Sequence, residues 1–253
     1  METYIYSSMV RELMRFRRIF AWLLVALAGF GMAALYRSLI ANGSPTEAYV
    51  LLSDTFAFRI LPLAAAILST AVVAQEVEQK TIVYLLTRPI PRWKLILFRT
   101  LGATTITFAI TAITLLVLAV STTGLSSAIL LRDLIAAAVG AAAYVSLFVF
   151  VSLLINKSMI VCIIFAFVWE STAPVIPGDL YRLTITGYLN GISQHPSFGT
   201  GNQNLMDALT KVLGTHEVAA WISYLSMGIL IAACLAISCA WFSRFEYMAR
   251  EDA

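Results

Sequence analysis

The chain has 253 residues, of which 60% are hydrophobic and 12% are charged, and its formal net charge is +3. A soluble domain carries roughly 25% charged and 45–50% apolar residues, so this composition excludes an ordinary water-soluble protein and indicates a membrane protein. The three cysteines, Cys162, Cys234 and Cys239, lie inside apolar runs, which argues against a disulfide scaffold.

The N-terminal segment is amphipathic. Its apolar side chains recur at helical spacing with arginines between them, at Met9, Leu13, Phe16 and Phe20. This pattern predicts an interfacial helix over residues 1–18 that leads into the first membrane span.

Six apolar segments follow, and the sequence predicts that each crosses the bilayer as a helix. They are Ile19–Ile40, Thr55–Ala74, Phe98–Val120, Leu131–Ile155, Met159–Pro174 and Val218–Phe242. All but the fifth have roughly the 20 residues that a helix needs to cross the hydrocarbon core. Continuous apolar runs favour an all-α bundle, since a barrel would show alternating segments of about ten residues. We therefore expect one six-helix domain over residues 1–253.

Positive charge is unevenly divided between the two ends of these spans. Of 17 Lys and Arg residues, one side has Arg11, Arg15, Arg17, Arg18, Lys80, Arg88, Arg92, Lys94, Arg99, Lys157, Arg244 and Arg250. The other side has Arg37, Arg59, Arg132, Arg182 and Lys211. The positive-inside rule places the richer side, and with it both termini, in the cytoplasm.

The longest cytoplasmic connection is the loop 75–97, which carries both signs of charge. Its residues Ile82, Leu85 and Leu86 share one helical face, and the helix stops near Arg88-Pro89 because the residue before a proline avoids the α region. Pro91 is placed to open the next helix, which runs into span three. The prediction is a short helix, a proline corner and a second helix; the alternative is an ordinary solvated loop.

On the opposite side, residues 175–217 form a segment too long for a simple turn. Two short helices are predicted in it, one over Asp179–Gly191 after an Asp cap and one over Asn204–Gly214, capped at both ends. The two histidines, His195 and His216, also lie here, but the sequence offers no further ligands for a metal site.

Two ionisable residues lie within or near the predicted spans. Arg59 is early in span two and Glu170 is near the end of span five, so both are expected at a similar depth near the outer face. Intramembrane charges often mark a transport pathway or an ion pair. Two independent side chains that reach toward lipid headgroups are the other interpretation.

The charged loop also carries a motif. Glu-x-Glu-x-x-Thr followed by Leu-Leu-x-x-Pro-x-x-Arg resembles the signature after span two in ABC-2 type permeases, the membrane subunits of a class of ATP-binding-cassette exporters. The matching residues are Glu76, Glu78, Thr81, Leu85, Leu86, Pro89 and Arg92. The family commonly has Gly-Thr where this chain has Lys80-Thr81. The N-terminal helix, the six spans and the two outer helices are similar to the family over the whole chain.

The resemblance implies a permease subunit in a bacterial plasma membrane. In that family the loop is a coupling helix that docks on a separate ATPase, so Glu76–Arg92, including Lys80, would be the docking surface. ATP and Mg²⁺ would be bound by the partner. Two ATPase subunits, a second permease copy or a relative, and membrane lipids are the implied partners. The cargo would be unidentified, with a lipid-like or amphipathic compound suited to the apolar outer helices.

Other functions are less well supported by the sequence. No Gly-Lys dipeptide is present, so the chain has no Walker loop, and no cluster typical of an intramembrane enzyme is visible. Nothing points to nucleic acid. A non-pumping subunit that transmits ATPase motion to an extracytoplasmic partner, in an assembly or maturation role, remains open beside export.

Overall fold

The computed structural model describes residues 16–39, 44–78, 92–125, 127–155, 157–172, 179–195 and 219–244, and these ranges contain helices and no strand. This confirms the all-α prediction over the described ranges. Three predicted features lie largely or wholly outside them: the N-terminal interfacial helix, the short helix of the charged loop and the second outer helix, Asn204–Gly214.

The helices follow one another in a simple order. α2 is Phe16–Leu39, α3 is Pro45–Leu52, the π-helix η1 is Ser53–Ala57 and α4 is Phe58–Glu78. α6 is Arg92–Ser121 and α7 is Ala128–Leu154. α8 is Ser158–Ile164, the π-helix η2 is Phe165–Trp169 and α9 is Glu170–Thr172. The 3₁₀ helix η3 is Asp179–Leu183, α10 is Ile185–Ser193 and α12 is Ala220–Arg244.

Four helical stretches in the described part are long and apolar enough to cross a membrane. They are Pro45–Val72, Trp93–Ser121, Ala128–Leu154 and Ala220–Ser243. The first and fifth predicted spans coincide with α2 and with α8–η2, where the apolar stretches are the shorter Ala26–Tyr36 and Ser158–Trp169. The count of six spans therefore stays a prediction.

Two helix starts differ from the sequence prediction, and both are explained by caps. The second apolar helix begins at Pro45, not near Thr55: the Ser44 hydroxyl accepts a hydrogen bond from the Glu47 N–H at 3.2 Å, and Pro45 suits the first helical position. The first outer helix does not run from an Asp179 cap. A 3₁₀ turn comes first, and α10 begins after Thr184.

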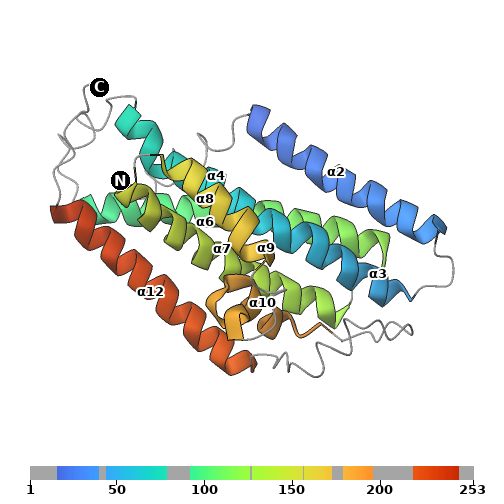
Figure 1. Cartoon of the computed structure of the whole chain (residues 1–253). Coiled ribbons are helices and arrows are strands. Elements are labelled where there is room, and N and C mark those ends of the chain that lie inside the picture. The colour runs from blue at the N-terminus through green and yellow to red at the C-terminus, as the bar shows by residue number, and fades with distance from the viewer. Residues whose placement is uncertain are drawn as a thin grey trace.

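α7 is the centre of the bundle, because it packs against α4, α6, α12 and α10 (Figure 1). Small side chains let its neighbours approach closely. A Cβ at Gly140 would lie 2.7 Å from a methyl group of Leu61 in α4 and 2.8 Å from one of Leu189 in α10. This approach brings the outer segment around α10 against the spans.

α2 and α12 lie on opposite sides of the bundle (Figure 1). Both expose large apolar side chains, among them Leu27 and Leu35 on α2 and Trp221 and Ile229 on α12. Exposed apolar surface of this kind suits lipid or a second membrane helix.

Candidate functional site

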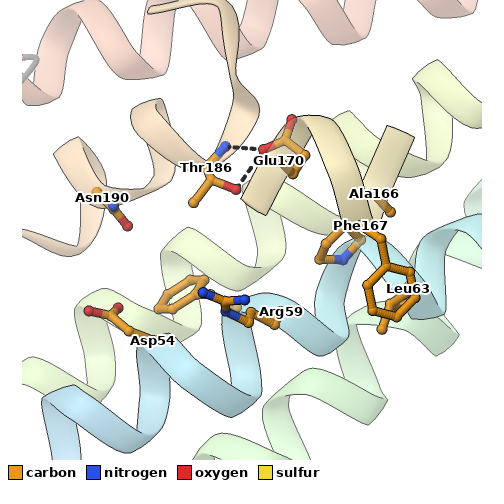
Figure 2. A pocket seen from close by; sticks show the side chains of 10 residues that line it. Asp54, Arg59, Leu63, Ala166, Phe167, Glu170, Thr186 and Asn190 are labelled. Atoms are coloured by element: carbon orange, nitrogen blue, oxygen red, sulfur yellow. Dashed lines mark hydrogen bonds between the residues drawn. The ribbon is translucent and has the colours of Figure 1, made fainter. Parts of the chain in front are cut away.

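A pocket of about 190 Å³ lies between α4 and the segment formed by η2, α9 and α10. Its polar lining is Asp54, Arg59, Glu170, Thr186 and Asn190, and its apolar lining is Phe58, Pro62, Leu63, Ala166 and Phe167. Figure 2 shows Asp54 and Arg59 on one continuous helix, with Glu170 and Thr186 on the elements that face it. The structure thus brings the two predicted charge candidates, Arg59 and Glu170, to one pocket.

Glu170 is the best-anchored polar residue of the pocket, with only 5% of its surface exposed. Its Oε1 accepts from the Ile185 N–H at 3.1 Å, and its Oε2 accepts from the N–H and hydroxyl of Thr186 at 3.0 and 2.6 Å and from the Tyr144 hydroxyl at 2.8 Å. The carboxylate therefore binds the first turn of α10, where backbone N–H groups and the helix dipole favour a negative charge.

Arg59 differs from Glu170 in both exposure and partners. Its side chain is exposed, and within the described ranges it makes no hydrogen bond or ion pair, including none to Glu170. Donors from α7 and α10 already occupy the acceptor positions of Glu170. The two residues share a pocket without forming a pair in this conformation.

Two π-helical turns line the same pocket. η1 contributes Asp54, and η2 contributes Ala166 and Phe167. A π turn inserts an extra residue into a helix and redirects the side chains around it, and such turns are frequent at functional sites. Sequence periodicity over such short turns gave no sign of them.

Beside the pocket, His195 lies between two aspartates. Its Nδ1 is 3.1 Å from Asp54 Oδ1 and its Nε2 is 2.7 Å from Asp133 Oδ1. The Tyr49 hydroxyl donates to Asp133 Oδ2 at 2.8 Å, so the chain Tyr49–Asp133–His195–Asp54 crosses from α3 through α7 to η1. We call these four residues the aspartate–histidine chain.

His195 is held in its charged form by this arrangement. Burial alone would lower its pKa, but the hydrogen bonds to Asp133 and Asp54 and their negative charges outweigh that effect and raise the pKa to about 9. The two ring nitrogens face different carboxylates, so the geometry is that of an ion triad in which one imidazolium bridges two carboxylates.

The predicted coupling residues lie at the other end of α4 and α6. Glu76 and Glu78 are in the last turns of α4, and Arg92 is the first residue of α6. The other members lie outside the described residues: Lys80, Thr81, Leu85, Leu86 and Pro89. Nearby, the buried Arg99 of α6 donates from Nη1 to the Val72 carbonyl of α4 at 3.3 Å. Sequence reasoning had counted Arg99 only as a cytoplasmic charge.

Four long apolar helices with ionisable groups gathered beside them define a multi-pass membrane protein. The family model described as ABC-2 family transporter protein matches residues 5–247, nearly the whole chain. The chain therefore belongs to the ABC-2 transporter family, whose members are membrane subunits rather than catalysts and generally act with ABC ATPase subunits. A search of curated proteins finds no match.

Proposed function

We propose that this chain is the permease subunit of an exporter with six spans, both termini in the cytoplasm of a bacterial cell, and a separate ATPase that docks on Glu76–Arg92. The family match over residues 5–247 is the observation that carries the proposal. Two permease chains and two ATPase subunits would form the complete transporter, and ATP and Mg²⁺ would be bound by the ATPase.

The helices on either side of the docking segment support a coupling role. The segment 79–91 joins α4 to α6, and these two helices pack against each other. The hydrogen bond from Arg99 to Val72 ties them together close to that segment. A force that the ATPase exerts on the segment would therefore displace α4 and α6 together.

The cargo is proposed to be amphipathic or lipid-like. The pocket between α4 and α10 supports this choice, because its lining is half polar and half apolar and it borders exposed apolar side chains such as Phe167. The long outer segment 175–217 suits the second function, in which the permease transmits ATPase motion to an extracytoplasmic partner. A transport assay with the reconstituted permease and ATPase in vesicles distinguishes the two functions: export of cargo supports the first, and its absence supports the second.

Charge reversal tests the docking proposal. Glu76→Lys with Glu78→Lys should leave membrane insertion intact but weaken co-purification of the ATPase, because the reversed charges replace attraction with repulsion. Glu246→Lys with Glu251→Lys is the matched control, since it changes the net charge equally on the same proposed face. Equal recovery of ATPase with both double variants, together with equal stimulated ATP turnover, would refute docking at this segment.

A further inference from the structure

We propose that the pocket between α4 and α10 binds the headgroup of a phosphodiester lipid whose headgroup carries hydrogen-bond donors, such as an ammonium or hydroxyl group. The lipid would enter from the side of the bundle with its acyl chains outside the pocket. The inference that this lipid is the transported substrate rests on the proposed export function. Binding of the lipid to the pocket requires only this chain.

The order of residues along both walls matches the orientation of a lipid. On one wall, Asp54 in η1 and Arg59 in α4 come before Pro62 and Leu63 along the chain. On the other wall, Ala166 and Phe167 in η2 come before Glu170 in α9. The two walls run in opposite directions in the bundle (Figure 1), so the polar residues gather at one end of the pocket and the apolar residues at the other, as an amphipathic ligand requires.

One charged group of the pocket lining is available to bind an anion. Asp54 faces the imidazolium of His195, and Glu170 is satisfied by four donors. Arg59 is the remaining charged group of the lining, and over the described ranges it has no anionic partner. A guanidinium presents parallel N–H donors that match the oxygens of a phosphate. Arg59 is therefore the phosphate-binding residue.

Asp54 and Glu170 limit the negative charge of the ligand and favour a ligand that carries hydrogen-bond donors. A phosphomonoester with two negative charges would be repelled by Asp54 and Glu170, so a singly charged phosphodiester fits better. About half of the Asp54 side chain is exposed, and it can accept a hydrogen bond from an ammonium or hydroxyl group. The Asn190 amide supplies a further acceptor on the α10 wall. A headgroup without donors would leave both acceptors unused.

The volume fits a headgroup and not a whole amphiphile. A space of about 190 Å³ would hold about six waters. Pockets that enclose a drug-sized molecule measure roughly 300–1,000 Å³. Acyl chains would have to lie outside, where Phe167 and Val168 are 56% and 57% exposed next to the pocket. The site is thus built for the polar end of a ligand that remains partly in the bilayer.

The test is a binding measurement with the full chain in detergent. The probe is phosphatidylethanolamine with a fluorophore on one acyl chain, followed by anisotropy. Arg59→Gln should weaken binding about 10- to 100-fold, the loss expected for a hydrogen bond to a charged group, whereas Arg59→Lys should retain part of the affinity. Arg132→Gln is the matched control, because Arg132 is an exposed arginine predicted on the same side and absent from the pocket lining. Thermal melts of each variant establish that it is folded.

Unlabelled competitors define the ligand class. Phosphatidylethanolamine and phosphatidylglycerol should displace the probe better than phosphatidylcholine, which lacks donors, and better than phosphatidic acid, whose phosphomonoester carries more charge. Equal loss of binding in Arg59→Gln and Arg132→Gln would overturn the site, and so would an unchanged affinity in folded Arg59→Gln. Equal displacement by glycerophosphoethanolamine, which has no tails, would overturn the lipid assignment. Because no ATPase is present, these outcomes are independent of the docking experiment.

Discussion

His195 Nε2 lies 2.7 Å from Oδ1 of Asp133, a carboxylate with no exposed side-chain surface. A buried carboxylate is costly unless donors satisfy it, and here Tyr49 and His195 satisfy its two oxygens from opposite sides. The aspartate–histidine chain therefore fastens α3, η1 and α7 to His195, two residues after the end of α10.

The first prediction is that stability falls at alkaline pH. His195 has a pKa of about 9 when folded and about 6.5 when unfolded, so its contribution is complete below pH 6.5 and is lost as the pH rises through 9. The shift corresponds to a contribution on the order of 3 kcal/mol. Melting temperatures between pH 6 and 10 should show this fall in the wild type and a flatter profile in His195→Gln. Parallel profiles for the two proteins would show that another group is responsible.

The second prediction concerns Tyr144 and Glu170. Tyr144→Phe removes a donor from a buried carboxylate and should lower the free energy of unfolding by about 1–3 kcal/mol, whereas in a Glu170→Gln background the same change should lower it less.

The effects of Arg59→Gln and Glu170→Gln on the free energy of unfolding should be close to additive, because the two side chains do not pair. Unfolding of the single and double variants measures both cycles, and strong coupling of Arg59 to Glu170 would contradict the geometry.

The third prediction concerns the glycine in the first turn of α10. A Cβ at Gly187 would collide with the backbone carbonyl of Tyr181, which cannot move aside as a side chain can. Gly187→Ala should destabilise by about 1–3 kcal/mol. Gly228→Ala on α12 is the control, because nothing lies within 4 Å of its added Cβ, and it should be neutral or stabilising by up to about 1 kcal/mol. The same thermal shift for both variants would count against the close contact.

The fourth prediction separates docking from transmission. Arg99→Met keeps an unbranched side chain but removes the hydrogen bond from α6 to Val72 of α4. We expect normal recovery of the ATPase in a pull-down and a lower permease-stimulated ATP turnover. Lys94→Met on the same helix is the control, since the Lys94 amino group lies over the Trp93 ring, 5.6 Å from its centroid. Wild-type stimulation by Arg99→Met would show that the helices need no such tie.

The fifth prediction is topological. A cysteine replacing Ser44 or Gly199 should react with an impermeant thiol reagent in intact cells, because both lie on the predicted outer side. One replacing Gln79 should react only after permeabilisation, because the positive-inside rule places it in the cytoplasm. The native cysteines are replaced by alanine beforehand. Reaction at position 79 in intact cells would reverse the proposed orientation.

The positions of the long helices were predictable because each is one continuous apolar run. The start at Pro45 was missed although Ser44, Pro45 and Glu47 form a recognisable capping sequence, because a hydropathy reading begins where polar residues end. Asp133 was not singled out from the sequence, because it lies beside Arg132 near the start of the predicted span Leu131–Ile155, where charged residues are common.

The partners in the outer site were beyond sequence reasoning. His195 and Asp133 are 62 residues apart, and Tyr49 and Asp133 are 84 residues apart, so only the packing of α7 against its neighbours brings them together. Arg59 and Glu170 were singled out from the sequence as charges near spans, but their different environments depend on α10, whose first turn supplies donors to Glu170 and none to Arg59.

Pro62 interrupts the hydrogen bonding of the second apolar helix. A proline has no N–H to donate to the Phe58 carbonyl, and the π turn η1 ends just before Phe58, so the regular α-helical hydrogen bonding is interrupted in this stretch. This interruption lies between the end of the helix at Pro45 and the end at Glu78. Pro62 is itself part of the pocket wall. A lateral force on the Glu78 end of the helix would bend it near Pro62, and this bending would change the width of the pocket.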